Sequence, residues 1–277
     1  MARVRRAVGH RRVGHAGTLD PGATGLLVVL VGRATRLSRF VAMLPKRYVG
    51  IIRFGVETST DDAAGEPAGE RDETWRDKDR DAILRALGQV QARPLQVPPA
   101  VSAKKVQGER AYRRARRGEE VTLREVPVLI SGLTLSTWDP DAGEAGVIVE
   151  CSAGTYVRAI ARDVGRALRT RAHLAALRRT TIGPWDVEPA LALDGCDAAA
   201  VQEALRPMAE AVAHLPAVIL PHADAERFKH GQKLPTADFA EGGDFASGAI
   251  AVFDAGGLIA VAEARAGILH PDVVLAA

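Results

Sequence analysis

Residues 14–25 read Gly14-His15-Ala16-Gly17-Thr18-Leu19-Asp20-Pro21-Gly22-Ala23-Thr24-Gly25. The glycines permit positive φ and a close approach of a ligand, while Pro21 fixes the backbone directly after Asp20 and favours extended geometry before it. This stretch therefore predicts a rigid turn that holds one carboxylate. An aspartate in such a turn ordinarily bonds its own backbone, and that is the alternative to a chemical role for Asp20.

The turn lies in a strongly basic part of the chain. Residues 1–60 contain 11 Lys or Arg and 2 Asp or Glu, whereas residues 186–277 contain 5 basic and 14 acidic residues. This distribution predicts that a polyanion binds the first part of the chain. All but six of the 37 basic residues are arginines, whose guanidinium groups suit phosphate contacts, although a GC-rich genome would produce the same bias.

Length and composition indicate a globular protein of the cytoplasm. With 277 residues, 47% of them apolar, the chain is long enough for one large domain and a small one. No apolar run approaches the ~20 residues that span a bilayer, and the N-terminus lacks the apolar core of a signal peptide. Cys151 and Cys196 form no Cys-x-x-Cys pair, so neither a disulfide framework nor a zinc site is indicated.

Hydrophobic patterns predict a mixture of strands and helices. The apolar run 26–31 is typical of a central strand buried on both faces, directly after Asp20. The acidic residues 56–80 predict a surface loop away from any RNA. The pattern further predicts a basic helix over 2–8, a helix over 35–44 capped by Thr35, strands over 48–54, 126–138 and 146–151, and helices over 83–90 and 157–168.

Two further segments bear on function. Residues 93–99 are too rich in proline for a helix or a central strand, and the very basic residues 110–117 follow, so the region predicts an inserted arm. Arg158 lies in the first turn of its predicted helix, where positive charge is unfavourable, which indicates a specific partner. After Pro216 the pattern predicts a small β-rich region.

Other constellations are weaker candidates. Asp61-Asp62 and Glu119-Glu120 are adjacent pairs in loops without His or Cys partners, so we discount them as acid–base pairs or metal sites. The glycine-rich turn lacks the Gly-Lys-Ser/Thr ending of a phosphate-binding P-loop. Tyr48 and Tyr156 could simply pack in a core.

Several motifs together resemble those of the bacterial tRNA pseudouridine-55 synthases, the TruB family. They are His15 and Asp20 in the turn, Lys46-Arg47-Tyr48, Gly154-Thr155-Tyr156-Val157-Arg158, Ser102-Ala103-Lys104-Lys105-Val106-Gln107-Gly108, and His173-Leu174-Ala175-Ala176-Leu177-Arg178-Arg179. The resemblance runs through nearly the whole chain and implies isomerisation of one uridine in the T-loop of tRNA, without a metal or other cofactor. The family begins with a strand and a Lys-Pro-x-Gly-x-Thr-Ser loop that brace the turn, and we expect this chain to lack both.

The resemblance assigns roles to individual residues. It implies that Asp20 is the nucleophile, that Tyr48 stacks on the target uracil, and that Tyr156 removes a proton. Arg158 would pair with Asp20, keep it ionised and orient it. His15 and Leu177 would line the uracil pocket, and Arg36 would contact RNA backbone. The basic helix 2–8 and the arm arginines would grip the RNA, namely Arg110, Arg113, Arg114, Arg116 and Arg117.

The resemblance also implies a fold and partners. We expect an α+β catalytic domain over residues 1–215, with a mixed, largely antiparallel sheet flanked by helices and a clamping arm at about 93–125, and a PUA-like RNA-binding domain over 216–277. The expected partner is the tRNA T-arm, bound by a monomer that needs neither a membrane nor an obligatory protein partner. Two alternatives stay open, a non-catalytic tRNA-binding or tRNA-folding factor and a pseudouridine synthase that acts on another RNA.

Overall fold

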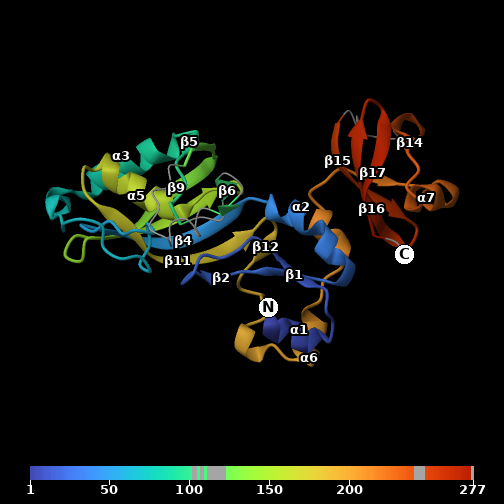
Figure 1. The fold of residues 1–277 in the computed structure, drawn as a ribbon, viewed down its shortest axis with the longest axis horizontal. Coiled ribbons are helices and arrows are strands. Elements are labelled where there is room, and N and C mark those ends of the chain that lie inside the picture. Colours follow the sequence, from blue (N-terminus) through green and yellow to red (C-terminus); the bar gives the residue numbers. More distant parts are fainter. Residues whose placement is uncertain (102–104, 107–108, 111–122, 240–246, 276–277) are drawn as a thin grey trace. The chain divides into compact units, whose positions relative to one another are not determined.

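Two larger sheets organise the chain (Figure 1). The structure is a computed structural model and describes residues 1–101, 105–106, 109–110, 123–239 and 247–275. It forms two compact units, each built from separate stretches of sequence. The first comprises residues 1–18, 27–42 and 190–277, and the second comprises residues 19–26 and 43–189. Along the described parts of the chain, no helix has the length and apolar character needed to cross a membrane.

The second unit is built on a six-stranded sheet, whose main path runs β12-β11-β4-β10-β9. Its pairs are antiparallel except that β2 lies parallel to β11 at one end. Alternating burial along β4 marks one face as core and the other as more exposed, as the period of two in a strand requires. The strands are β2 (Thr24–Gly25), β4 (Lys46–Phe54), β9 (Ile130–Asp139), β10 (Glu144–Cys151), β11 (Ala172–Ile182) and β12 (Trp185–Asp186).

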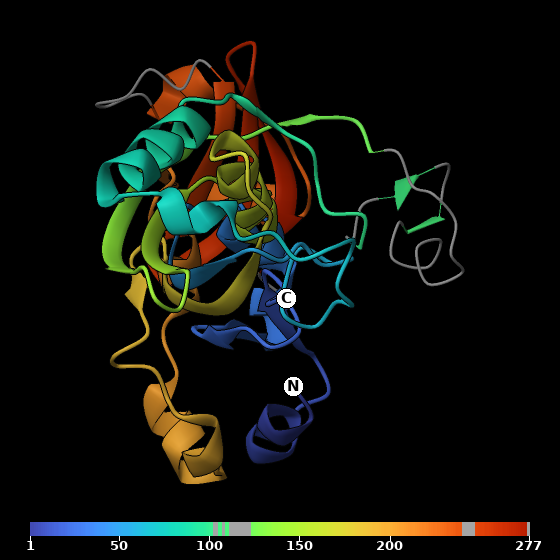
Figure 2. The same ribbon diagram turned by 90° about the vertical axis from the view of Figure 1, so that its left-hand side faces the viewer.

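Helices α3 (Arg80–Gln91) and α5 (Val157–Ala167) cover one face of this sheet and lie next to each other (Figure 2). The Asp79 side chain caps α3 by accepting from the Ala82 N–H at 2.7 Å. Residues 157–165 of α5 are all buried, so this helix lies inside the unit rather than on its surface. Around these elements run η2 (Thr74–Asp77) and the short pairs β5 (Leu95–Gln96) with β8 (Val126–Pro127) and β6 (Lys105–Val106) with β7 (Glu109–Arg110).

The loop over residues 56–80 is fastened to the start of β11 by Asp72. Its carboxylate accepts hydrogen bonds from the N–H and hydroxyl of Thr74 at 2.7 and 2.6 Å, and from the Thr170 hydroxyl and the Arg171 N–H, both at 2.8 Å. Partial burial raises the pKa of Asp72, but these hydrogen bonds outweigh burial and lower the pKa to about 2. The bonds therefore stabilise the fold only while Asp72 is ionised.

Asp72→Asn is expected to destabilise the protein by about 1 kcal/mol at pH 7, because the amide replaces an acceptor by a donor. The folded pKa lies below the unfolded value of about 3.9, so this stabilisation is present above pH 4 and is lost as the pH falls toward 2. Urea unfolding between pH 7 and pH 2.5 should therefore show a shallower acid decline for the variant. Asp141→Asn, in the exposed β9–β10 turn, is the control, and an Asp72→Asn curve parallel to that of wild type would contradict the prediction.

The first unit contains a small antiparallel pair and short helices. In that pair β1 (Val13–Ala16) runs against β3 (Val28–Val31). The basic helix α1 (Ala2–Val8) contacts α6 (Ala198–Ala204), and Arg3 donates to the Leu193 carbonyl at 2.8 Å and to Asp194 at 2.9 Å. The remaining short elements of this part are η1 (Gly32–Leu37), α2 (Ser38–Ala42), η3 (Leu193–Gly195) and η4 (Met208–Val212).

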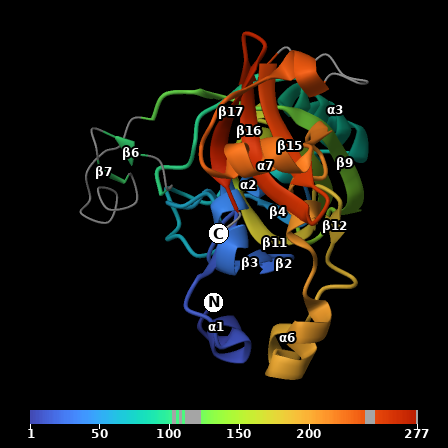
Figure 3. The ribbon, with the colours of Figure 1, turned by 90° about the vertical axis from the view of Figure 1, so that its right-hand side faces the viewer.

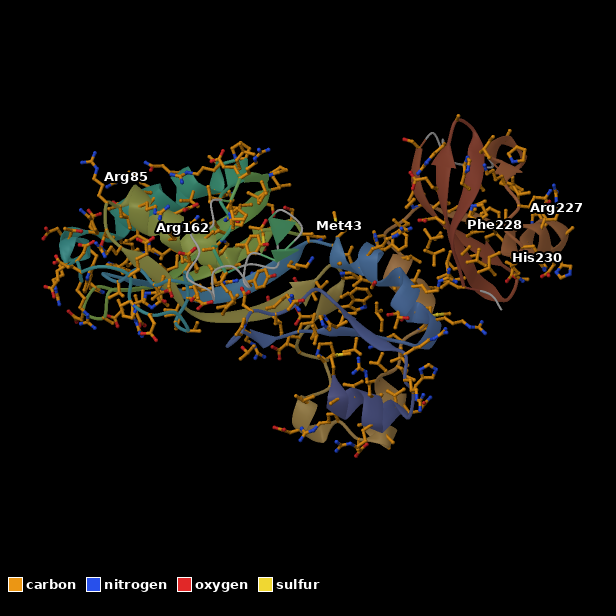
Figure 4. All side chains as sticks on the ribbon, in the orientation of Figure 1. Met43, Arg85, Arg162, Arg227, Phe228 and His230 are labelled. Carbon is orange, nitrogen blue, oxygen red and sulfur yellow. The ribbon has the colours of Figure 1, made fainter. Side chains whose placement is uncertain are left out.

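A five-stranded sheet of order β13-β15-β16-β17-β14 forms the C-terminal part of the first unit (Figure 3). Helix α7 packs against it, with Phe228 buried toward the sheet and Arg227 and His230 pointing away (Figure 4). This sheet is the expected PUA-like, β-rich region. Its elements are β13 (Ala217–Ile219), α7 (His222–Lys229), β14 (Leu234–Pro235), η5 (Thr236–Phe239), β15 (Ser247–Asp254), β16 (Gly257–Arg265) and β17 (Ile268–Val274).

The expected α+β class with a largely antiparallel sheet and a small β-rich C-terminal region is confirmed. Two expectations about residues 26–44 are wrong. The run 26–31 is not a central strand, because only residues 28–31 form a strand, and that strand lies half-buried in a two-stranded sheet. Residues 35–44 are not one helix, since the 3₁₀ helix η1 precedes the five-residue α2 and the Thr35 hydroxyl bonds the Gly32 carbonyl instead of capping.

Candidate active site

The turn that carries Asp20 is tied to the large sheet directly after the acid. The Ala23 N–H closes the turn onto the Asp20 carbonyl at 3.0 Å. Strand β2 then pairs with residues 178–179 of β11, and the Leu26 N–H donates to the Arg179 carbonyl at 2.8 Å. The buried Arg179 returns a bond from its Nε to the Leu26 carbonyl at 2.9 Å. These contacts hold the Asp20 turn beside residues 178–179 of β11.

Gly25 is the residue that allows this approach. Its φ is +97°, and a Cβ at this position would overlap the carbonyl oxygen of Arg179 and lie 2.8 Å from the Arg179 nitrogen. Backbone atoms of a paired strand cannot move aside as a flexible side chain can. Gly22, with φ +82°, would meet nothing within 4 Å. Alanine at position 22 would therefore be destabilising through positive φ alone, whereas alanine at position 25 would also clash with the Arg179 backbone.

Gly25→Ala is expected to destabilise the protein by about 2–3 kcal/mol, since the methyl group forces β2 away from β11 and the backbone conformation is strained. Gly22→Ala should cost about 1 kcal/mol, because only the conformational strain applies. Urea unfolding of both variants checks this. Equal losses for the two variants would contradict a close approach at Gly25.

Arg158 holds the Asp20 carboxylate through both of its oxygens. Its Nε donates to Oδ2 at 3.0 Å and its Nη2 donates to Oδ1 at 2.8 Å, the two-pronged geometry that suits a guanidinium and a carboxylate. The same group also donates to the Thr60 carbonyl at 3.0 Å and the Val101 carbonyl at 3.3 Å, and lies 3.3 Å from an Asp62 oxygen. Four hydrogen bonds and the ion pair with Asp62 therefore fix the orientation of the Arg158 guanidinium.

Burial differs between the two partners of this pair. The Arg158 side chain is 5% exposed, whereas that of Asp20 is 31% exposed. Each carboxylate oxygen has two lone pairs, and Arg158 uses one on each. Asp20 is thus held by a buried cation, while its carboxylate keeps free lone pairs and exposed surface for a ligand.

Asp62 is a residue of this site that the sequence reasoning missed. The loop over 56–80 folds back onto β11, where the Ala63 N–H donates to the Leu174 carbonyl and the Leu174 N–H donates to the Asp61 carbonyl, both at 3.0 Å. Asp62 is buried there, with one oxygen accepting from the Thr60 hydroxyl at 2.5 Å and the Ala64 N–H at 3.0 Å, and the other facing Arg158. The signal in the sequence was the adjacent pair Asp61-Asp62, which we discounted above. Two carboxylates stay buried only beside a cation, so such a pair in a folded loop indicates a buried arginine or lysine partner.

A pocket of about 300 Å³ opens at the Asp20 carboxylate. Residues 20–23, 62–64 and 174–177 line it together with Arg158. Leu177, predicted to line the uracil pocket, is among these residues and packs partly against the main core. The pocket lining thus combines two carboxylates and a guanidinium with mainly small apolar residues, as is typical of small-molecule sites.

Tyr48 lies on β4 within the main core and is 8% exposed. Its pKa is raised, first of all by burial, and the negative charge of Asp20 adds to the rise while Arg179 opposes it. The phenol is hydrogen-bonded to the Arg179 side chain, which also braces Leu26. Tyr48 is therefore electrostatically coupled to Asp20 and linked to the contacts that hold the turn.

Tyr156 is the residue at which α5 begins, two positions before Arg158, and it is half-buried. Its N–H donates to the Gln96 Oε1 at 2.9 Å, and its carbonyl accepts from the Gln96 Nε2 at 3.1 Å. Gln96 lies in the proline-rich segment 93–99, which the sequence analysis interpreted only as part of an inserted arm.

The remaining predicted site residues belong to the first unit or to the predicted arm. His15, on β1, and Arg36, in η1, are exposed and belong to the first unit, where Arg36 donates to the Val274 carbonyl. The predicted RNA-gripping residues Arg113, Arg114, Arg116 and Arg117 lie outside the described residues. Arg110 is described only as part of the short strand β7.

The chain matches a family of known proteins. The family model described as "TruB family pseudouridylate synthase (N terminal domain)" matches residues 5–157. A tRNA pseudouridine synthase B of Thermobifida fusca is 43% identical over 289 residues, which cover 100% of this chain and 93% of the relative. The protein of the same name from Streptomyces coelicolor is 40% identical over 281 residues, covering 96% of this chain and 89% of the relative.

Among solved structures, a crystal structure of a Cbf5-Nop10-Gar1 complex superposes with a TM-score of 0.75 at 22% identity, covering 99% of this chain and 79% of that one. This superposition shows that the fold of the chain is also similar to that of a solved structure. The sequence relatives and the family model, taken with the site at Asp20, lead to one conclusion. The chain belongs to the TruB family of pseudouridylate synthases.

Proposed function

We propose that the protein isomerises the uridine at position 55 in the T-loop of tRNA to pseudouridine, with Asp20 as the nucleophile. The observation that carries this proposal is the grip of Arg158 on both oxygens of Asp20, at 2.8 and 3.0 Å, inside a pocket that leaves the carboxylate 31% exposed. The relatives named tRNA pseudouridine synthase B support the choice of substrate.

The reaction breaks the bond between C1′ and N1 of the uracil and forms a bond between C1′ and C5. A carboxylate is suited to this exchange because it can form and release a covalent bond to the ribose or to the base. Once C5 is attached, its proton leaves and N1 gains one, so atoms and charge balance within the substrate. Tyr156 would accept the C5 proton on its phenol oxygen while its own hydroxyl proton passes to solvent, from which N1 takes a proton. This balance requires no cofactor.

The target base must leave its stack before Asp20 reaches it, at a cost of a few kcal/mol. The pocket walls at residues 62–64 and 174–177 would enclose the flipped ring, with Leu177 against it. Tyr48 does not line this pocket, and its stacking on the ring would require a rearrangement in the bound state. His15 would line the same site in the bound state. The basic helix α1, Arg36 and the arm over residues 93–125, with Arg110, Arg113, Arg114 and Arg117, would bind the phosphate backbone.

The remaining parts of the proposal concern organisation and location. We assign catalysis to residues 1–215 and RNA binding to the C-terminal sheet over residues 216–277. The protein would act as a monomer in the cytoplasm on the T-arm of tRNA, without an obligatory protein partner.

The test is incubation of the protein with an unmodified tRNA transcript, followed by mapping of pseudouridine at single-nucleotide resolution. We expect conversion at position 55 and none in a transcript that carries cytidine there. Binding without any conversion would overturn the proposal in favour of a non-catalytic tRNA-binding factor. Conversion of a different RNA alone would overturn the choice of substrate.

A further inference from the structure

Two walls of the pocket at Asp20 are joined where β2 pairs with β11. One wall is formed by residues 20–23 and the other by residues 174–177 of β11. Each wall continues directly into the parallel pairing of β2 with residues 178–179 of β11 (Figure 1). Because both walls lead into this pairing, it sets how far apart they lie.

Arg179 joins the two segments with both its backbone and its side chain. Its carbonyl accepts from the Leu26 N–H at 2.8 Å, and its Nε donates to the Leu26 carbonyl at 2.9 Å. Gly25 is its register partner on β2 and lies so close that a Cβ there would overlap the Arg179 carbonyl oxygen. The bond from the guanidinium is the part of this joint that a substitution can remove while the backbone contacts stay possible.

The guanidinium of Arg179 is held from the side of β4 as well. Arg179 is the register partner of Tyr48 on β4, and the Tyr48 phenol is hydrogen-bonded to the Arg179 side chain. Because a guanidinium can only donate, the phenol oxygen is the acceptor of this bond. Arg179 thus connects Leu26, six positions after Asp20, to the central strand of the six-stranded sheet.

The burial of Arg179 indicates that this connection matters beyond packing. Its side chain lies in a residue that is 1% exposed, the lowest value for a charged residue in the described part of the chain. Removing a guanidinium from water is costly, and an apolar side chain of similar volume would fill the same space without that cost. Such a side chain could bond neither the Leu26 carbonyl nor the Tyr48 oxygen. The arginine therefore specifies one position of Leu26 against the sheet.

We propose that Arg179 is a positioning residue for the isomerisation, which fixes the Asp20 turn against β11 and so sets the width of the pocket beside the nucleophile. This inference rests on the proposed function, in which Asp20 attacks the flipped uridine. Arg158 holds the carboxylate at the start of the turn, and Arg179 holds the end of the turn through Leu26. Arg179 does not line the pocket and acts through the backbone that does.

The variant that tests this is Arg179→Met, which keeps most of the side-chain volume and removes the bonds to Leu26 and Tyr48. We expect single-turnover pseudouridine formation at saturating protein to slow roughly tenfold to hundredfold, the loss typical of a displaced catalytic group. The tRNA dissociation constant should stay unchanged, because a buried guanidinium makes no phosphate contact. Amide hydrogen exchange gives the second readout, since it reports local opening. Exchange at residues 19–26 should accelerate severalfold, whereas exchange along the β9–β10 pair should keep the wild-type rate.

Arg162→Met is the matched control for the exchange measurement. Arg162 is another buried arginine of the same unit, and it pairs with Asp61 at 2.8 Å and Asp163 at 2.9 Å. Its loss should leave exchange at residues 19–26 at the wild-type rate. The control thus shows whether the loss of any buried arginine loosens the turn.

A second variant covers the case in which Arg179→Met does not melt cooperatively. Arg179→Lys keeps the positive charge, but its single ammonium lacks the fork that reaches two separate acceptors. The same pattern is expected for it, with a smaller loss of rate and faster exchange at residues 19–26.

Three results would overturn the inference. The first is an unchanged rate in Arg179→Met, and the second is a slower rate with wild-type exchange at residues 19–26. The third is an equal acceleration of exchange in β9 and β10, or in Arg162→Met, which would mean that the whole unit is weakened rather than the turn. A wild-type protein that forms no pseudouridine would instead overturn the proposed function, whereas the exchange pattern needs no substrate and would still report whether Arg179 holds the turn.

Discussion

Asp20→Asn is expected to abolish pseudouridine formation, with a fall of at least about 10⁴-fold in single-turnover rate. The amide has the size of the carboxylate, and its oxygen can still accept one bond from Arg158. It lacks the negative charge that makes a carboxylate oxygen nucleophilic enough to attack the substrate. Binding of tRNA should change little, because Asp20 contributes no positive charge to the phosphate contacts that dominate affinity.

The measurement is single-turnover conversion of a tRNA transcript at saturating protein, together with the dissociation constant from filter binding. Asp141→Asn is the matched control, since it makes the same chemical change at an exposed turn and should retain wild-type activity. A variant at position 20 that retained more than a few per cent of the wild-type rate would exclude Asp20 as the nucleophile. Loss of both conversion and binding would indicate a folding defect, which thermal melting would reveal.

Removing Arg158 should have the second largest effect, because it changes both stability and activity. Arg158→Met leaves the carboxylates of Asp20 and Asp62 together without their shared cation, and Asp62 is only 12% exposed. We expect a loss of about 3 kcal/mol in the free energy of unfolding, within the range for one partner removed from a buried pair. Pseudouridine formation should fall by at least about 10³-fold, since Asp20 loses its orientation.

Arg158→Lys should separate the two effects. The ammonium keeps the positive charge and restores part of the stability, but it cannot bond both oxygens of Asp20 in one plane. Activity should therefore remain about 10²-fold below wild type. Urea unfolding and single-turnover conversion of both variants measure the two quantities independently.

Arg162→Met is the control for the loss of a buried arginine that does not contact Asp20. Arg162 lies one turn along α5, its side chain is 7% exposed, and it pairs with Asp61 at 2.8 Å and Asp163 at 2.9 Å without touching Asp20. It should lose a similar amount of stability but far less activity. An equal loss of activity in Arg162→Met and Arg158→Met would mean that Arg158 acts only through the fold.

The sequence predicted those elements whose pattern is long and regular. Strand β4 and helices α3 and α5 follow from alternation or helical spacing over many residues, and all three are confirmed. The run 26–31 was wrongly predicted as a single strand because its residues lie in two different environments. Leu26 belongs to the contacts between β2 and β11, whereas residues 28–31 pair with β1. Apolar composition alone cannot show where a chain changes partners.

The site could be predicted only in part from the sequence, because the contacts that build it join residues far apart in the chain. Arg158 in the first turn of a helix indicates that a partner exists, but nothing in the residues shows that it lies 138 positions away. The resemblance to a family supplied that pairing. Asp62 and Gln96 were missed because each lies in a polar or proline-rich loop, where such residues are ordinarily solvated. Their burial arises from long-range contacts, namely Asp62 with β11 and Gln96 with the start of α5.

The short excursion of residues 19–26 into the second unit has a consequence for biosynthesis. Strand β2 must wait for residues 178–179, which leave the ribosome more than 150 positions later. Contacts of such separation form late and slowly. The nascent protein can therefore bury its helices and most of its sheet while its nucleophile is still unanchored. Catalytic competence therefore waits until residues 178–179 have been made, about two thirds of the way along the chain, and a fragment that begins at residue 43 could reproduce much of the scaffold without the reaction.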